Sequence, residues 1–192
     1  MIFYKDNYWV FQDAILPEVC NEIISLAKDK GFSESLVAGG DHVGAIRNSS
    51  CAFINHQWLY DLFCPYVVTA NKNTGWDFDI DWHEDIQIVR YFPNEQYKWH
   101  QDITPPKDLD STHPNYRGKI RKLTAFVILS DSFSGGKFQF SFQDSGKINV
   151  HTPELTVGTI IIFPSFHWHR GTPVVKGTKY SMTLWSLGPP FK

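Results

Sequence analysis

The chain has 192 residues, of which 42% are hydrophobic and 16% aromatic, a composition that fits one folded domain and excludes a disordered chain. Its net charge of −2 excludes a global positive field of the kind that recruits nucleic acid or an anionic membrane. The amino terminus lacks a signal-peptide pattern and no later segment approaches a membrane span, so we expect a cytoplasmic protein.

The first part of the chain predicts a short strand followed by a helix. The strand is expected in YWVFQDAI and the helix in LPEVCNEIISLAKDKG. Pro17 lies near the start of this helix and Gly31 at its end, which are the positions these residues favour. Apolar residues at helical spacing give it one buried face: Val19, Ile23, Ile24 and Ala27.

A second helix is predicted from about Gln57 to Asn71, although Pro65 interrupts its pattern. The three cysteines of the chain are widely spaced and odd in number, and none lies in a CxxC pair: Cys20, Cys51 and Cys64. This pattern argues against a disulfide framework and a thiolate zinc site, and it favours a reducing compartment. We interpret the cysteines as small buried apolar residues.

After Trp76 the sequence changes to short β-rich runs separated by turns. The predicted strands are DIQIVRYF, KLTAFVILS, KFQFSFQ, KINVHTP, TIIIFP and KYSMTLWS. Many short strands at such spacing indicate an antiparallel sandwich or barrel. We expect one domain over residues 1–192, with a helical support region at 1–84 and a β core at 85–192. The connection 103–120 is too long for a hairpin and is expected to be a lid.

The segment YKWHQD places His100 and Asp102 two positions apart. Residues two apart on a strand project to the same side, so this pair can chelate one ion from a single strand end. Imidazole plus carboxylate suits iron, manganese or zinc rather than calcium. Because the same spacing often arises by chance, a polar turn that carries a histidine is the alternative for this pair taken alone.

A third ligand has to come from another histidine. His167 and His169 follow the strongly apolar run TIIIF and share a face if the strand continues, so both are candidates. The alternative is two histidines at a sheet edge among aromatic residues. His151 could face inward, but nothing near it supports a site. The remaining histidines are most simply surface residues: His42, His56, His83 and His113.

A lysine lies downstream of these histidines. Lys179 begins KYSMTLW, whose alternation puts Lys179, Ser181 and Thr183 on one face of a strand. A lysine on a strand next to a metal site can hold a carboxylate deep inside a barrel as a point charge. The alternative is a lysine that extends to solvent from a strand end.

Together these motifs resemble the Fe(II)- and 2-oxoglutarate-dependent dioxygenases, and most closely the prolyl 4-hydroxylase branch with its bacterial and phage-like members. The matching features are His-x-Asp, a histidine about 67 residues later in HRGTPV, and a basic residue with a serine in GTKYS. Three further segments are similar to the family: IRNSSCAFI, IQIVRYFPNEQYKWHQD and RKLTAFVILSDSFSGGKFQF. The resemblance implies a mainly β fold, a double-stranded β-helix or cupin-like jelly roll, with helices that support one sheet.

The resemblance also implies a role for individual residues. His100, Asp102 and His169 would bind iron, since the HRGTPV context selects His169 over His167. Lys179 would pair with the distal carboxylate of 2-oxoglutarate. Four other residues would line the cosubstrate pocket: Tyr91, Thr124, Ile128 and Ser181. No catalytic residue is expected beyond the metal ligands.

The substrate residues implied by the resemblance are Arg47, Tyr97 and Trp99. Arg47 is expected at the mouth of the site, where it would bind a substrate backbone or carboxylate, with a surface arginine as the alternative. The aromatic residues Tyr97, Trp99 and Trp168 would shield the centre or form the substrate wall, with plain core packing as their alternative. Lys137 and Trp99 depart from the residues that are common in relatives, and both leave the substrate open.

The activity implied is oxidative decarboxylation of 2-oxoglutarate coupled to hydroxylation of a substrate C–H bond. The expected cofactors are Fe(II), 2-oxoglutarate and O2, with ascorbate as a further candidate. The expected partner is a prolyl residue of a peptide or protein, with a small molecule as the alternative. A zinc-type or noncatalytic cupin-like binding protein is the competing function, in which His167 would complete a closed tetrahedral site. A β-sandwich interaction module without metal would leave these residues unexplained.

Overall fold

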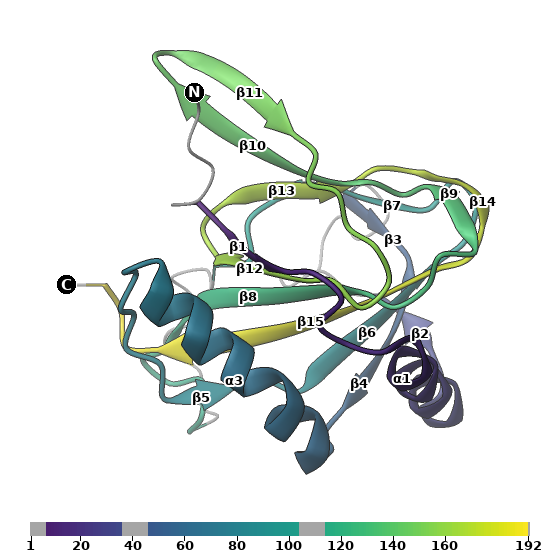
Figure 1. The fold of residues 1–192 in the computed structure, drawn as a ribbon, viewed down its shortest axis with the longest axis horizontal. Helices are drawn as coiled ribbons and strands as arrows, with labels where there is room; N and C mark the ends of the chain where they lie inside the picture. Colours follow the sequence, from purple (N-terminus) through teal and green to yellow (C-terminus); the bar gives the residue numbers. More distant parts are fainter. Residues whose placement is uncertain (1–6, 36–45, 104–113, 192) are drawn as a thin grey trace.

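In a computed structural model of the chain, two antiparallel β-sheets face each other and two helices cover the outer face of the larger sheet (Figure 1). The structure describes residues 7–35, 46–103 and 114–191. Within these residues no helix is long and apolar enough to cross a membrane. The expected lid at 103–120 falls mostly outside the described residues, as do His42 and His113.

The larger sheet runs through the middle of the molecule, and β15 lies near its centre (Figure 1). Its strand order is β1-β12-β8-β15-β6-β4-β2, and β5 pairs with β15 outside this path. The strands are β1 (Trp9–Phe11), β2 (Ser33–Glu34), β4 (Ser50–Ile54), β5 (Trp82–His83), β6 (Ile86–Tyr91), β8 (Ile120–Ile128), β12 (Ile160–Pro164) and β15 (Lys179–Gly188).

The smaller sheet carries the two histidines of the candidate metal site, His100 and His169. Its order is β11-β10-β13-β7-β3, and a two-stranded sheet of β14 and β9 adjoins it. The strands are β3 (Arg47–Asn48), β7 (Gln96–His100), β9 (Phe133–Gly135), β10 (Phe138–Asp144), β11 (Lys147–His151), β13 (Trp168–Gly171) and β14 (Val174–Gly177). The first 84 residues therefore supply strands to both sheets as well as the helices.

Both predicted helices are present. Helix α1 (Pro17–Lys30) begins at its proline and ends before Gly31, which has a φ of 88°. Helix α3 (Gln57–Asn73) continues through Pro65. Four residues of α3 are fully buried against the sheet: Leu59, Phe63, Val67 and Ala70. This packing stabilises the helix enough to tolerate the lost main-chain hydrogen bond at the proline.

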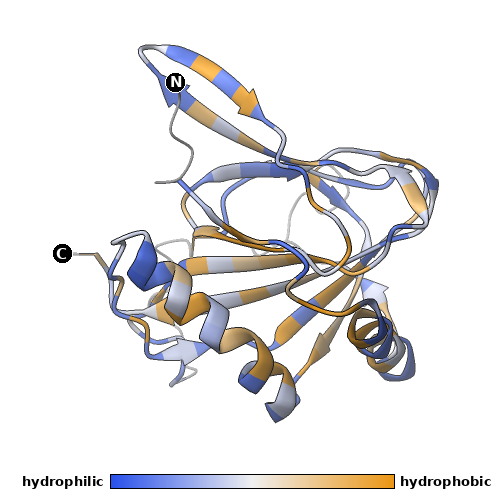
Figure 2. Ribbon diagram, viewed as in Figure 1, coloured by the Kyte–Doolittle hydropathy of each residue, from blue (hydrophilic) through white to orange (hydrophobic). Residues whose placement is uncertain are grey.

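The alternation of side chains along the central strands separates two environments. On β8, Leu123, Ala125 and Val127 pack under the helices, whereas Thr124 and Phe126 line a cavity between the sheets. On β15, the predicted face of Lys179, Ser181 and Thr183 is confirmed, because all three line the same cavity. In Figure 2 these strands carry many hydrophobic residues, as expected for a sheet that is covered on both faces.

The cysteines are free, and Cys20 and Cys51 are buried while Cys64 is half-buried. Burial raises the pKa of the Cys20 thiol to about 11, which keeps it protonated and unreactive. The interpretation of Cys20 and Cys51 as small apolar core residues is confirmed.

Candidate active site

His100 and His169 come together because their strands are neighbours. Strands β7 and β13 pair so that His100 lies directly opposite His169. Asp102 follows the end of β7, where its backbone N–H donates to the Ser165 carbonyl at 2.8 Å. One ligand atom from each of His100, Asp102 and His169 lies within 4.8 Å of the others. They form the one group of three His, Cys, Asp or Glu side chains, among the described residues, that could hold a metal ion.

A β-bulge in β7 decides which of its side chains face the cavity. His100 pairs with His169 and Tyr97 with Gly171, so three steps along β7 oppose two along β13. The extra residue lets Tyr97 and His100 both face inward. Trp99 packs elsewhere: the Arg170 guanidinium lies 4.5 Å from its ring centre. Trp99 is not among the described residues that line the cavity, although the sequence assigned it to the substrate.

Each site histidine is held by a carbonyl two residues before it. Nδ1 of His100 lies 2.7 Å from the Lys98 oxygen, and Nδ1 of His169 lies 2.9 Å from the His167 oxygen. A carbonyl oxygen can only accept, so Nδ1 carries the proton of the neutral ring and Nε2 keeps its lone pair. The Nε2 atoms lie 3.6 and 3.4 Å from the two carboxylate oxygens of Asp102. Two lone pairs and a carboxylate thus converge on one point, which is the donor set of a 2-His-1-carboxylate metal site.

The protonation states suit a metal. Burial, with His169 nearby, lowers the pKa of His100 to about 3, so its ring is neutral at pH 7. Burial alone would raise the pKa of Asp102, but this pKa is held well below its ordinary value, with the Arg121 guanidinium among the causes. Asp102 is therefore ionised and His100 can offer a lone pair.

Thr124 and Ser165 fix the carboxylate of Asp102. The Thr124 hydroxyl donates to Oδ2 of Asp102 at 2.9 Å and lies 3.0 Å from the Ser165 hydroxyl. Thr124 was assigned to the cosubstrate from sequence, and in the structure its hydroxyl donates to the Asp102 carboxylate. Arg121, which is paired with Glu84 at 2.6 Å, donates to the main-chain oxygen of Asp102 at 3.4 Å.

Lys179 lies on the same cavity as the His-Asp-His group. Its side chain is only 3% exposed, and its ammonium donates to the Gly136 carbonyl at 2.7 Å. Among the described residues it has no carboxylate partner. Burial lowers its pKa to about 8. A buried cation without a counter-ion is unfavourable in the free protein, so this position favours an anionic ligand.

Tyr91 and Ser181 lie next to Lys179 on the wall of the cavity, and their contact with the cosubstrate stays a prediction. Tyr91 pairs with Lys179 across β6 and β15, and Ser181, which is fully buried, lines the cavity. Burial raises the pKa of Tyr91, although the neighbouring Arg47 opposes the rise. Ile128 is buried in an aromatic cluster and is not among the described residues that line the cavity.

Arg47 lines the cavity, and its expected place at the mouth of the site stays a prediction. It is 5% exposed, and it donates to Ser49 at 2.9 Å and to Gln87 at 3.0 Å. Its guanidinium lies 4.8 Å from the centre of the Tyr97 ring. Tyr97 in turn stacks on His100. The side chain of Arg47 therefore reaches the cavity wall from β3 instead of extending to solvent.

Sequence reasoning missed several residues that line the cavity. They are Gln87, Val89, Phe126, Phe138, Phe163 and Trp185. The alternation of β15 already put Thr183 on the inner face, and two further residues along the strand give Trp185. Phe138 and Phe163 carried no signal, because phenylalanines in strands are ordinary core residues.

His167 does not join the metal group. The strand TIIIF ends at Pro164, and a turn separates it from β13. The His167 ring packs edge-on to Phe142, with 5.4 Å between centres. A closed four-ligand zinc site, which the alternative function requires, is therefore not favoured.

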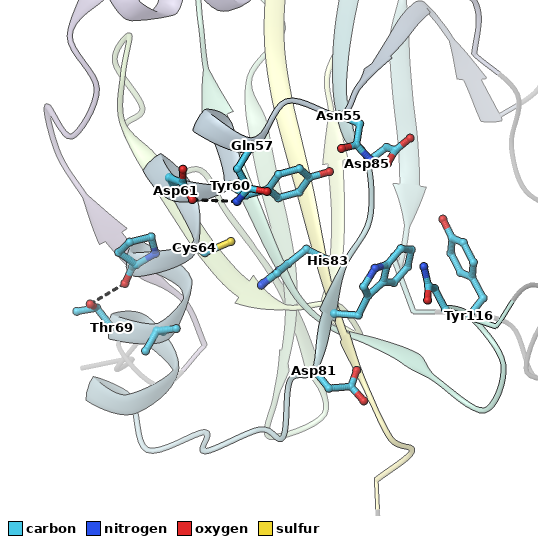
Figure 3. Close-up of a pocket in the computed structure, with 14 residues that line it drawn as sticks. Asn55, Gln57, Tyr60, Asp61, Cys64, Thr69, Asp81, His83, Asp85 and Tyr116 are labelled. Atoms are coloured by element: carbon cyan, nitrogen blue, oxygen red, sulfur yellow. Dashed lines mark hydrogen bonds between the residues drawn. The ribbon is translucent and has the colours of Figure 1, made fainter.

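A second and larger hollow lies on the helix side of the molecule. This groove of about 1110 Å³ lies between α3 and the residues around β5 (Figure 3). Figure 3 shows Cys64 of α3 and His83 of β5 on its walls. His83 was expected at the surface, but it is half-buried, with Nδ1 2.9 Å from the Ser186 hydroxyl. The described residues of the groove include no metal-binding group.

Comparison with known proteins identifies the family. The profile of the 2OG-Fe(II) oxygenase superfamily matches residues 86–187, more than half of the chain. The chain belongs to the 2OG-Fe(II) oxygenase superfamily. Membership implies Fe(II), 2-oxoglutarate and O2 as its cofactors. The predicted family and the predicted class of enzyme are confirmed.

Individual relatives of this oxygenase are prolyl hydroxylases. A protein of Acanthamoeba polyphaga mimivirus that bears the name prolyl 4-hydroxylase is 28% identical to this chain. The alignment covers 92% of this chain and 72% of the viral protein. The viral collagen prolyl hydroxylase of Paramecium bursaria Chlorella virus-1, solved as a 2OG complex, has a TM-score of 0.68 at 21% identity over 95% and 96% of the two chains.

A third relative was solved with a peptide. The Trichoplax adhaerens prolyl hydroxylase, in complex with a hypoxia-inducible factor fragment, has a TM-score of 0.66 at 17% identity. The alignment covers 94% of this chain and 83% of that one. These structural matches confirm the predicted jelly-roll fold with two supporting helices.

Proposed function

We propose that this oxygenase hydroxylates a prolyl residue of a peptide or protein, with iron held by His100, Asp102 and His169 and 2-oxoglutarate held by Lys179. One observation carries the proposal: a convergent His-Asp-His group shares one cavity with a buried ammonium that has no carboxylate partner among the described residues. The first suits a divalent metal, and the second suits the distal carboxylate of a dicarboxylic acid.

The residues of the chain fit both groups. When bound, iron and 2-oxoglutarate supply the oxidising chemistry, in which succinate and carbon dioxide form and one oxygen atom enters a substrate C–H bond. His100 and His169 offer Nε2 because their Nδ1 protons are held by carbonyls. Thr124 keeps Asp102 oriented through a hydrogen bond to Oδ2. None of these residues has to move a proton.

Aromatic rings form much of the wall of the site. The rings of Phe138 and Phe163 lie 5.5 and 4.8 Å from the His169 ring, centre to centre. The centre of the Phe126 ring lies 5.5 Å from Nζ of Lys179. A dry cavity strengthens the attraction between the ammonium and a carboxylate, and it protects reactive species from side reactions.

A prolyl substrate is supported by the relatives, among which the Trichoplax enzyme was solved with a peptide. Within this chain we assign the substrate side of the site to Tyr97, whose ring covers His100. Arg47 would act on substrate through Tyr97, beneath which it packs. Trp99 would contribute only at the outer face. Binding of ascorbate, a cytoplasmic location and the single-domain organisation over 1–192 stay predictions.

The test is a coupled assay with matched peptides. The iron-loaded protein is incubated with 2-oxoglutarate and a proline-rich peptide library, and succinate is measured beside a mass gain of one oxygen in the peptide. We expect both signals with proline peptides and only slow succinate formation when every proline is replaced by alanine. Oxidation of alanine peptides at the same rate would contradict the prolyl assignment. Absence of any succinate would contradict the cofactor assignment.

A further inference from the structure

The Lys179 ammonium has one hydrogen-bond acceptor among the described residues, and it belongs to a glycine turn. This acceptor is the main-chain oxygen of Gly136, at 2.7 Å. An ammonium has three N–H donors, so two are left for a ligand. A neutral carbonyl does not cancel the charge, and the lysine therefore stays available to an anion. The position of this carbonyl decides where the ammonium lies in the cavity.

The turn also fits closely around the lysine stem. Gly136 has a φ of +54°, and a Cβ built on it would lie 3.1 Å from Cδ of Lys179, 3.1 Å from Cγ2 of Val174 and 3.3 Å from Cε2 of Phe133. These separations are shorter than ordinary van der Waals contact. The lysine cannot easily move away, because the rings of Tyr91, Phe126 and Phe133 surround its ammonium at 5.5, 5.5 and 5.9 Å.

The neighbouring glycine has a different role. A Cβ on Gly135 would lie 2.5 Å from the Pro173 carbonyl oxygen and 2.8 Å from the main-chain nitrogen of Val175. Gly135 is therefore required by the backbone pairing of β9 and β14. Gly136 keeps the same turn closed through its N–H, which donates to Pro173 at 2.8 Å. Among the described glycines, only at Gly136 would an added Cβ press on the lysine.

We propose that Gly136 is a positioning residue for the cosubstrate: its carbonyl and its missing side chain together hold the Lys179 ammonium where a dicarboxylate is bound. This inference rests on the proposed function, in which that dicarboxylate is 2-oxoglutarate. Gly136 touches neither cosubstrate nor metal in this role and acts through Lys179 alone.

The experiment compares substitutions at two glycines that both have a positive φ. Gly146 also has a positive φ, +78°, but a Cβ there meets no atom within 4 Å. Dissociation constants for 2-oxoglutarate are measured anaerobically in the Fe(II) protein from the metal-to-ligand absorption band. Gly136→Ala should weaken binding about three- to tenfold, as expected when a buried side chain is pushed off its rotamer. Gly146→Ala should bind like the parent, and both variants should keep the parent's affinity for Fe(II).

A double-mutant cycle tests whether the effect passes through the lysine. In the Lys179→Ala background, Gly136→Ala should cause no further loss of 2-oxoglutarate affinity. A loss of the same size in both backgrounds would overturn the inference, and so would parent-like binding by Gly136→Ala alone. A parent protein that gives no absorption band with 2-oxoglutarate would instead overturn the proposed function.

Folding of the variant is controlled separately. If Gly136→Ala does not fold, Val174→Ala is added, because it removes the Cγ2 atom that faces the new methyl group and leaves the contact with Lys179. The double variant is then compared with Val174→Ala alone. Weaker binding of 2-oxoglutarate by the double variant supports the inference, and equal binding overturns it.

Discussion

His100 and His169 are each oriented by the main-chain carbonyl of the residue two positions earlier. In the segment HWH, only the second histidine, His169, reaches Asp102. His169→Ala should therefore abolish tight Fe(II) binding, because it removes one of three ligands. His167→Ala should keep it, since the carbonyl of residue 167 that holds Nδ1 of His169 remains. Equilibrium dialysis against Fe(II) under nitrogen measures both. Loss of iron from His167→Ala would show that its side chain is a ligand after all.

Lys179 offers the only charge that we assign to the cosubstrate. Lys179→Ala would leave the distal carboxylate of 2-oxoglutarate buried without a partner, a loss on the order of 3–5 kcal/mol, or roughly two to four decades in affinity. Lys179→Arg should recover part of this, because the charge remains while the larger head group fits less well. Anaerobic titration of 2-oxoglutarate gives the three affinities. Parent-like binding by Lys179→Ala would remove the cosubstrate role from this residue.

The depressed pKa of Lys179 gives a pH dependence with a defined sign. Burial lowers this pKa from 10.5 to about 8 in the cosubstrate-free protein, so the ammonium is charged below pH 8 and neutral above it. The affinity for 2-oxoglutarate should be level below pH 8 and should fall as the pH rises above about 8, because only the charged lysine pairs with the carboxylate. Lys179→Arg should show no such fall, because a guanidinium stays charged. Calorimetric titration of 2-oxoglutarate into the Mn(II)-loaded parent and Lys179→Arg proteins measures both affinities at each pH. The same pH dependence in both proteins would contradict the prediction.

At the residue scale the metal group could be predicted from sequence because its motif is local. His100 and Asp102 are two apart, and the context of His169 marks it within its family. The parity argument for His100 and Asp102 was only partly right: β7 ends at His100, and Asp102 is placed by the Ser165 carbonyl. Trp99 and Arg47 could not be placed in this way, because a bulge and a tertiary hydrogen-bond network decide where they point.

At the element scale, the Arg47 side chain links β3 to two other strands: it donates to Gln87 of β6 and contacts the Tyr97 ring of β7. Arg47→Ala would leave the buried Gln87 oxygen without its donor, and it would remove the contact with the Tyr97 ring. An unsatisfied buried polar group costs about 1–3 kcal/mol, so the free energy of unfolding should fall by about that amount. Urea unfolding at constant m-value measures it.

Arg170 provides the matched control for this prediction. It also stacks on an aromatic ring and donates to a glutamine, Gln139, at 2.8 Å, but it is half-exposed. Arg170→Ala should therefore lose less stability, since water can replace its hydrogen bond. An equal fall in the free energy of unfolding in the two variants would mean that burial of the Arg47 hydrogen bonds adds nothing to stability.

The long elements could be predicted because their patterns are regular, and the short ones could not. Helix α1 and strands such as β8 and β15 follow from periodicity. Strands of two residues, such as β2, β3 and β5, carry no period, and their position depends on a neighbouring strand. Helix α3 runs through Pro65 because its buried face outweighs the local penalty.

At the scale of the whole molecule, the metal site joins the two sheets. His100 and His169 belong to the smaller sheet, and Asp102 is bonded to Thr124 of β8 in the larger one. That two sheets face each other could be predicted from the number of strands and from the family resemblance. How residues 1–84 contribute to both sheets did not, because pairing between distant segments leaves no periodic signal in the sequence.

A ligand that bridges the sheets should stabilise the whole fold, since it binds the native state and finds no preformed site in the unfolded chain. Mn(II) at 100 times its dissociation constant should add about 2.7 kcal/mol to the free energy of unfolding, seen as a higher melting temperature. Asp102→Ala should abolish this gain. Asp61→Ala, in the groove on the helix side, should keep it. If Asp61→Ala lost the gain as well, or Asp102→Ala kept it, Mn(II) would be acting at another place, and the His-Asp-His group could not be the element that ties the two sheets together.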